Sequence, residues 1–311
     1  PMQIWVADLR NAPGDTAAAR ITRVTRDGFW YGDPQWVPDG SCLVVHANRT
    51  ADQESVRYSI NRNFDLWKID LVHGCRLERL TTGPGPEFSP RISPDGRRIA
   101  CLSSPRKGPH MDTFNLALVE PAPGDTTTRV LFDHHGPGAD APPHLPPAYP
   151  LPDDCWRDTR RVTFLGLCGL GNEPQCVDVD AGSTCVAVDP PVPARRSPLL
   201  PRANPGIGPR LRAVDEVVRW KSFDGLQIEG VLTKPPPSVA KPPFKLLLVP
   251  HGGPHTRAGG GGGFDTQIFA TRGFAVFHPN FRGSTGYGRA FLDANRRDPG
   301  GGDMRDILTG I

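Results

Sequence analysis

Short hydrophobic runs separated by turn-forming residues fill the first 190 residues of the chain. Two segments share a Pro-x-x-x-Pro-Asp-Gly frame, DPQWVPDGSCLVV (Asp33 to Val45) and SPRISPDGRRIACL (Ser89 to Leu102), and a weaker copy is RDTRRVTFL (Arg157 to Leu165). Proline fixes φ at one turn position and glycine accepts a positive φ. Each frame therefore predicts a hairpin turn that is followed by a strand.

Further strand-like runs lie between these frames and often end in an acidic residue and a turn. They are QIWVADL, FDLWKIDLVHG, LERLTTG, FNLALVEPAPG, RVLFDHHG and QCVDVDAG. Four short strands in a repeat of about 40 to 60 residues are typical of β-propeller blades. We expect three to four blades in residues 1–188, with a β-sandwich as the structural alternative.

A different pattern follows a Pro-rich connection at residues 189–212. Alternating strands and helices predict an α/β domain over residues 213–311. The expected elements are two strands in 216–235, a strand buried on both faces at 245–251, a helix ended by Gly273, a second buried strand at 274–280, and a final helix that continues to the end of the chain. In that helix Met304, Ile307, Leu308 and Ile311 fall on one apolar face.

Composition narrows the class of protein. The 36 Pro and 35 Gly residues fit a turn-rich β protein, and 37% hydrophobic residues can form a packed core. The formal charge of +3 without a basic block predicts no nucleic-acid partner. No apolar run approaches the roughly 20 residues that span a bilayer, so we expect no membrane partner. The chain opens with Pro1 in a strand-like pattern and without a recognisable signal peptide, which suggests a piece of a longer protein.

The seven cysteines have no C-x-x-C spacing, and the sequence predicts reduced structural thiols in a cytoplasmic protein. Three histidines in the insertion at 134–154 lack a carboxylate pattern and are not expected to bind a metal. The glycine run at 259–263 lacks the Gly-Lys-Ser/Thr end of a phosphate loop and is interpreted as a surface loop. No cofactor is predicted.

Two loops that follow the strands at 245–251 and 274–280 are the candidates for chemistry. The loop HGGPH (His251 to His255) places adjacent glycines just past a strand. Their N–H groups could stabilise the oxyanion of an acyl-transfer intermediate, or the glycines could simply form a tight turn. The second loop, NFRGSTGYG, contains Ser284, but Arg282 replaces the first glycine of the G-x-S-x-G elbow. Ser284 is therefore interpreted as a bystander.

The blades with Pro-Asp-Gly turns, LLLVPHGGPH and HPNFRGSTGYGRAFLDANRRDPGGGDMRDI together resemble the prolyl oligopeptidase family of serine peptidases, in its acylaminoacyl-peptidase and dipeptidyl-peptidase branch. The similarity is specific from about Glu216 onward and moderate before it, and Phe281 is a mild departure. It implies a partial β-propeller (all-β) followed by the N-terminal part of an α/β-hydrolase domain at 213–311.

The resemblance also implies a function. Members of the family cleave short peptides with a Ser-Asp-His triad, and a propeller lid limits access. It implies that Gly253, with Gly252, supplies an oxyanion-hole N–H, and that His251 braces its loop. The loop from Arg282 to Gly288, with Gly283, Ser284 and Tyr287, would line the active-site wall.

No catalytic triad residue is expected in the chain itself. The family's nucleophile elbow would lie roughly 20 to 30 residues beyond Ile311, so the chain alone is predicted to be inactive. Short peptide substrates are the expected partners, and a homo-oligomer is compatible with the sequence.

Two other functions stay open at this point. One is a non-catalytic propeller module that binds proteins and carries a vestigial hydrolase half, and the other is an esterase of the same α/β-hydrolase fold. If the family's strand order holds, the strand KLLLV would be an open apolar edge, so the isolated chain is predicted to be poorly soluble.

Overall fold

The computed structural model describes residues 2–8, 20–49, 63–105, 114–122, 126–134, 145–185, 213–253, 255–259 and 263–311. The chain divides into two compact units. Unit 1 comprises Pro1–Gly136, His144–Gly166 and Pro174–Ala194, and unit 2 comprises Pro137–Pro143, Leu167–Glu173 and Arg195–Ile311. The predicted connection at 189–212 lies outside the described residues, as do His135 and His144 of the predicted insertion. The domain boundaries therefore stay predictions.

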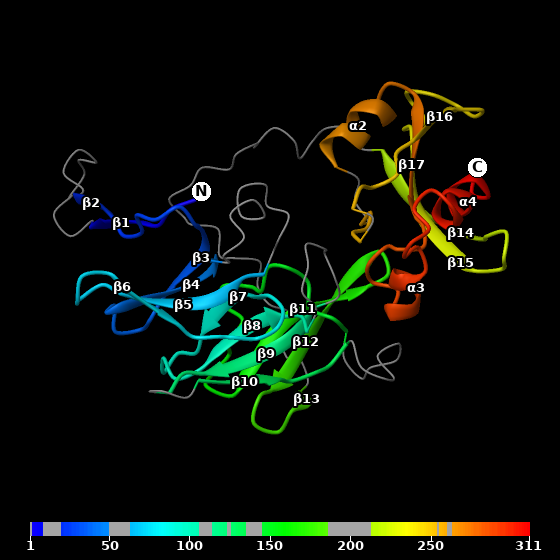
Figure 1. Ribbon diagram of the computed structural model, residues 1–311. Coiled ribbons are helices and arrows are strands. Elements are labelled where there is room, and N and C mark those ends of the chain that lie inside the picture. The colour runs from blue at the N-terminus through cyan, green and yellow to red at the C-terminus, as the bar shows by residue number, and fades with distance from the viewer. Residues whose placement is uncertain are drawn as a thin grey trace. The chain divides into compact units, whose positions relative to one another are not determined.

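In its described residues, unit 1 contains antiparallel sheets of sequential strands, and one hairpin end, Leu167–Glu173, belongs to unit 2 (Figure 1). Two of these sheets have four strands, one has three and one has two. The first four-stranded sheet contains β3 (Trp30–Trp36), β4 (Cys42–Asn48), β5 (Asp65–Asp70) and β6 (Arg76–Arg79), and the second contains β7 (Glu87–Ile92), β8 (Ile99–Ser103), β9 (Asn115–Glu120) and β10 (Thr127–Val130). The others contain β11 (Arg161–Cys168), β12 (Gly171–Asp178) and β13 (Ser183–Cys185), and β1 (Trp5–Asp8) and β2 (Arg20–Arg23). The two four-stranded sheets have the strand number of a propeller blade, and the number of blades stays a prediction.

The two Pro-Asp-Gly frames form the same structure in the two four-stranded sheets. Gly40 and Gly96 both have φ of 74° in the turns that join β3 to β4 and β7 to β8. Each turn is closed by a hydrogen bond from the glycine N–H to the carbonyl three residues earlier, at 2.8 Å. Asp33 and Ser89, at equivalent positions, have φ of 51° and 54° within a β-bulge of the first strand. The sequence repeat is therefore a structural repeat.

Arg91 joins three segments of unit 1. Its side chain is almost fully buried, and its guanidinium donates to Asp33 Oδ2 at 2.9 Å and to the carbonyls of Leu151 and Pro152 at 2.5 and 3.0 Å. The indole N–H of Trp156 donates to the Arg91 carbonyl at 2.8 Å. The bulged strands β3 and β7 and the segment before β11 are thus held together by one buried cation, in addition to their apolar core.

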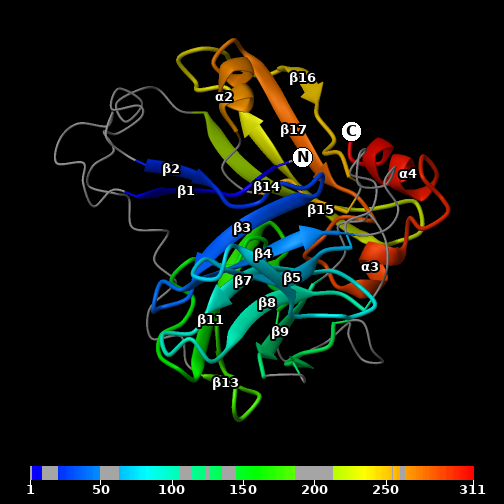
Figure 2. The ribbon, with the colours of Figure 1, turned by 60° about the vertical axis from the view of Figure 1, so that its left-hand side comes forward.

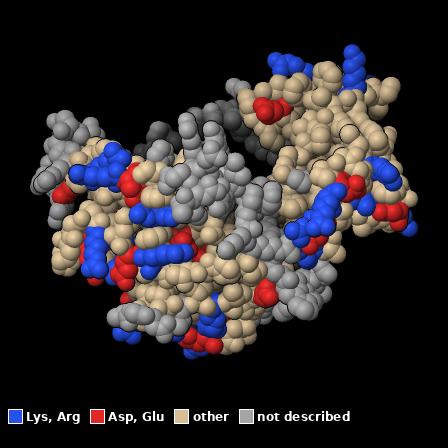
Figure 3. All heavy atoms as spheres, in the orientation of Figure 1, with Lys and Arg blue, Asp and Glu red and all other residues tan. Residues whose placement is uncertain are grey.

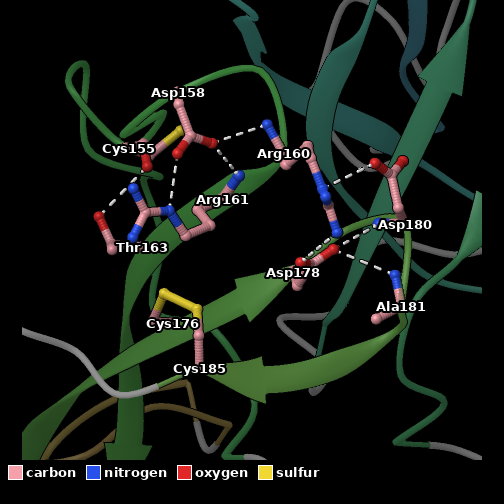
Figure 4. The surroundings of a disulfide bond; sticks show 10 residues. All are labelled: Cys155, Asp158, Arg160, Arg161, Thr163, Cys176, Asp178, Asp180, Ala181 and Cys185. Carbon is pink, nitrogen blue, oxygen red and sulfur yellow. Dashed lines mark hydrogen bonds and ion pairs between the residues drawn. A yellow bond between two sulfur atoms is a disulfide. The ribbon is translucent and has the colours of Figure 1, made fainter.

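The prediction of seven reduced thiols is wrong for one pair. Cys176 and Cys185 form a disulfide between β12 and β13, with a Cα–Cα distance of 5.0 Å (Figure 4). The carboxylate of Asp178 accepts the N–H groups of Asp180 and Ala181 and closes the hairpin turn. This turn sets a register that places the two cysteines directly opposite each other, within disulfide reach. The other five cysteines are free thiols.

Unit 2 contains a four-stranded mixed sheet in the order β14-β15-β17-β16 (Figure 2). The strands are β14 (Val214–Lys221), β15 (Gln227–Lys234), β16 (Lys245–Leu248) and β17 (Phe274–Asn280), and the helices are α2 (Phe264–Ala270), α3 (Arg289–Asp293) and α4 (Gly302–Leu308). Gly225 has φ of 87° in the predicted turn between β14 and β15. Helix α2 packs on β17 and β15, and Gly273, with φ of 92°, follows it as predicted.

Two predictions for unit 2 are wrong in detail. β16 is not buried on both faces, since Leu246 is 46% exposed, but it is the edge strand of this sheet, as the predicted open apolar edge requires. Helix α4 ends at Leu308, and only Ile307 of its predicted apolar face is buried. Met304, Leu308 and Ile311 are about half to two-thirds exposed, at 49%, 60% and 63%. The buried side of α4 instead carries Asp306.

The described surface carries charges of both signs. On the face shown in Figure 3, Lys and Arg side chains lie beside Asp and Glu side chains. Arg160, for example, pairs with Asp178 and Asp180, at 2.8 and 3.0 Å. Among the helices of the described ranges, none has the length and apolar character to cross a membrane. The same residues contain no group of three or more His, Cys, Asp or Glu side chains arranged to hold a metal ion.

We expect a pH dependence of unit 1 from Glu87. Burial, and then the nearby Asp65 charge, raise the pKa of Glu87 to about 7. Below pH 4.5 both the folded and unfolded states are protonated, whereas between about 4.5 and 7 only the folded state keeps the proton. The stability that Glu87 contributes should therefore be lost as the pH rises through about 7.

The variant Glu87→Gln should remove this slope in urea unfolding between pH 5 and 8, and the exposed Glu78→Gln should keep it. An unchanged slope in Glu87→Gln would contradict the assignment.

Candidate active site

Two loops of unit 2 meet because their strands are parallel neighbours. Residues Lys245–Leu248 of β16 pair with Phe274–Phe277 of β17. The carboxyl ends of both strands therefore lie at the same edge of the sheet, where α/β sheets place their ligand sites. We call residues 249–259 the first loop and residues 281–288 the second loop. The candidate residues predicted from the sequence all lie in these two loops.

The first loop presents two glycines to solvent. Gly252 and Gly253 are exposed, and their N–H groups have no acceptor among the described residues. Gly253 has φ of 127°, and a Cβ at this position would lie 2.9 Å from the backbone nitrogen of His255. Gly252 has open space around its Cα. The chain conformation therefore requires glycine at 253 and leaves both N–H groups free to bind an anion.

Ser284 is fully buried in the second loop. Its Oγ donates to the Phe281 carbonyl at 2.6 Å and lies 2.8 Å from Nε2 of His251. A serine and histidine at this distance resemble the first two members of a catalytic triad. Burial prevents this hydroxyl from reaching a substrate carbonyl, which supports its interpretation as a bystander.

His251 connects the two loops. Its ring stacks on Phe281, with centroids 4.5 Å apart and an interplanar angle of 14°, and its Nδ1 lies 3.0 Å from the Gly252 carbonyl. In a triad a carboxylate would occupy that position. Burial lowers the pKa of His251, and the contact of the ring with the Gly252 carbonyl opposes this shift. A second connection is the hydrogen bond from the Thr285 N–H to the Thr256 carbonyl, at 2.9 Å.

Arg282 is directed into the unit and is bound to Asp306 of α4. Its Nε and Nη2 donate to the two carboxylate oxygens, and its backbone N–H donates to Oδ2, all at 2.8 Å. The Ser222 hydroxyl donates to Oδ1 of the same carboxylate at 2.5 Å. Asp306 is fully buried, and these hydrogen bonds raise the pKa of Arg282. The guanidinium therefore anchors the second loop.

Gly283 and Tyr287 complete the predicted wall. Gly283 has φ of 96°, and a Cβ there would lie 2.3 Å from Nδ2 of Asn295, so no side chain fits. The hydroxyl of the half-buried Tyr287 donates to Glu229 Oε1 at 3.0 Å. Burial is the main cause that raises the pKa of Tyr287. Their role as an active-site wall stays a prediction.

Sequence reasoning missed Asp306, because α4 was assigned its buried face from apolar residues alone. It also missed Glu229, which lies on β15, directly opposite Asn280 of β17. One signal in the sequence could have indicated Asp306. It is an Asp on the helix next to a predicted buried residue, with an Arg in a nearby glycine-rich loop.

The candidate site lies in two loops at the carboxyl ends of the parallel strands of a mixed sheet that packs against helices. Residues 262–311 match the model of the prolyl oligopeptidase family. The chain is 34% identical over 99 residues to the uncharacterized peptidase YuxL of Bacillus subtilis, covering 32% of this chain and 15% of that protein. It is 26% identical to dipeptidyl-peptidase 5 of Porphyromonas gingivalis and 25% identical to the acylamino-acid-releasing enzyme of Sus scrofa, covering 91% and 90% of this chain and 44% of each relative.

One solved structure has the same fold along most of the chain. It is a candidate dipeptidyl aminopeptidase IV from Bacteroides ovatus, with a TM-score of 0.50 at 15% identity, covering 94% of this chain and 47% of that one. These comparisons confirm the predicted resemblance to the prolyl oligopeptidase family and the predicted fold class. The chain spans less than half the length of the curated relatives it matches.

We expect Arg282→Leu to destabilise unit 2 strongly. The substitution leaves the Asp306 carboxylate buried without its cation, a situation that costs about 3–5 kcal/mol. The matched control is Arg305→Leu, because Arg305 is exposed and packs over the same Phe223 ring. Urea unfolding followed by tryptophan fluorescence measures both. Equal free energies of unfolding for the two variants would contradict this account.

Proposed function

We propose that the chain is part of a serine peptidase of the oligopeptidase class, which releases short or N-acylated residues from peptides. The free N–H groups of Gly252 and Gly253 at the end of a parallel strand carry this proposal. They match the donors that a tetrahedral acyl-transfer intermediate requires. The names of the relatives, an acylamino-acid-releasing enzyme and a dipeptidyl-peptidase, support short peptides as the substrates.

In this mechanism the two glycines stabilise the oxyanion, and the nucleophile comes from residues outside this chain. The sequence contains no G-x-S-x-G elbow, and the His251–Ser284 pair is buried and has the Gly252 carbonyl where a triad has its carboxylate. The chain alone would therefore be inactive. His251 would hold the donor loop in place, and the second loop would form the neighbouring wall.

The proposal includes a cytoplasmic location and leaves the oligomeric state open. The Cys176–Cys185 disulfide is the observation that weighs against the location, because disulfides are rare in reducing compartments. The non-catalytic binding module and the esterase are the competing functions.

A fluorophosphonate probe tests the function. The full-length protein should be labelled. Residues 1–311 alone should not be labelled, and neither should full-length protein that was first treated with a serine-hydrolase inhibitor. Ser284→Ala in the full-length protein should keep its labelling, because this hydroxyl is buried. Loss of labelling in Ser284→Ala, with folding intact, would overturn the assignment. Acyl-amino-acid, dipeptidyl and simple ester substrates then distinguish the peptidase subtypes from an esterase.

The two glycines provide a matched pair of variants. Gly253→Ala forces a side chain onto a φ of 127°, against His255, and should misdirect the donor. We expect kcat of the full-length enzyme to fall about 100-fold with little change in KM, the size seen when one oxyanion donor is lost. Gly252→Ala adds a methyl group into open space and should change kcat much less. Equal effects of the two variants would contradict the proposed donor geometry.

A further inference from the structure

Asn280 makes three hydrogen bonds that connect the two loops. It is the last residue of β17 and is fully buried. Its Oδ1 accepts the Ala258 N–H at 2.7 Å, and its Nδ2 donates to the Ala258 carbonyl at 2.9 Å and to the Tyr287 hydroxyl at 2.8 Å. The amide thus pairs with the backbone of the first loop as a strand would.

The orientation of this amide is determined by its partners. The N–H of Ala258 requires an oxygen, and its carbonyl requires an N–H donor. The single proton of Tyr287 goes to Glu229, so the tyrosine oxygen accepts from Nδ2. Both N–H groups of the Asn280 amide are therefore used, and no other side chain of this size offers the same set.

The first loop has other fixed points at both ends. Val249 continues the pairing with Phe277, the His251 ring contacts Ser284, and the Thr256 carbonyl accepts the Thr285 N–H. The Arg257 guanidinium donates to the Gly169 carbonyl and to Asn172 Oδ1. Asn280, which binds Ala258 next to Arg257, holds the backbone of the far end, beyond the two glycines, while His251 holds the near end. The direction of the glycine N–H groups thus depends on both ends.

We propose that Asn280 is a positioning residue, which fixes the donor loop of the active site through Ala258 and couples it to Tyr287 of the second loop. This inference rests on the proposed function, since the loop is significant for acyl transfer only if Gly252 and Gly253 bind the oxyanion. Asn280 itself touches no reacting atom.

Hydrogen exchange in the 311-residue chain tests the positioning role without any activity. Asn280→Ala and the isosteric Asn280→Asp should each accelerate exchange in peptides covering 255–259 and 281–288 about tenfold or more, because hydrogen bonds that hold the loop are lost. Exchange in the β14–β15 hairpin should not change. The matched control is Thr233→Val, which removes the hydrogen bond from the buried Thr233 to Asp215 in the same sheet and should accelerate exchange in neither loop.

Unchanged loop exchange in both Asn280 variants would overturn the proposal. A uniform acceleration of the whole sheet, or failure of both variants to fold, would also overturn it, because the amide would then support the sheet rather than the loop. In the full-length enzyme, Asn280→Ala should lower kcat about tenfold or more with KM little changed, and Thr233→Val should leave both constants unchanged. Absence of fluorophosphonate labelling in the unmodified enzyme would refute the proposed function alone, since the exchange result does not depend on it.

Discussion

The candidate site depends on the buried carboxylate of Asp306. A charge without solvent is costly unless its oxygens are hydrogen-bonded, and here Arg282 and Ser222 supply the donors. These residues come from α4, the second loop and the turn after β14, so the carboxylate obtains all of these donors only when the three segments are in place. The second loop in turn holds the first loop through His251. The exposed glycines are therefore positioned by an interaction that lies inside the unit.

The contact between His251 and Ser284 shows why distance alone does not identify a catalytic pair. A hydroxyl 2.8 Å from an imidazole nitrogen is the geometry of a general base and its nucleophile. In this chain the hydroxyl is buried and bonded to Phe281, and the ring has a backbone carbonyl at its other nitrogen. In this chain a histidine and a serine join two loops. Two features distinguish such a structural pair from a catalytic one: whether the hydroxyl is exposed, and whether a carboxylate lies at the second ring nitrogen.

Local sequence signals predicted the strands, the repeated hairpins and the two loops well. Proline, glycine and the spacing of hydrophobic residues determine the backbone conformation within a few residues, so their effects can be predicted without a structure. The Cys176–Cys185 disulfide depends on strand register, which is set by the pairing of β12 with β13. The open edge at β16 was predicted only because the family resemblance supplied a strand order. The Asp306–Arg282 pair was missed because an acidic residue in a helix is normally assigned to solvent. For the candidate site, the sequence indicated the glycine loop but not the residues that hold the two loops in place, such as Asp306.

The left-handed residues Asp33 and Ser89 limit how far the two repeats can diverge. At these bulges the backbone directs the Asp33 carboxylate and the Arg91 guanidinium toward each other, and the Ser89 hydroxyl accepts the Leu151 N–H. Branched residues at Cβ are strongly disfavoured at such a φ, whereas Gly, Asn and Asp adopt it at low cost. Substitutions at these two positions are therefore restricted to a narrow set, so the two repeats keep the same backbone path here while the sequences around the bulges differ.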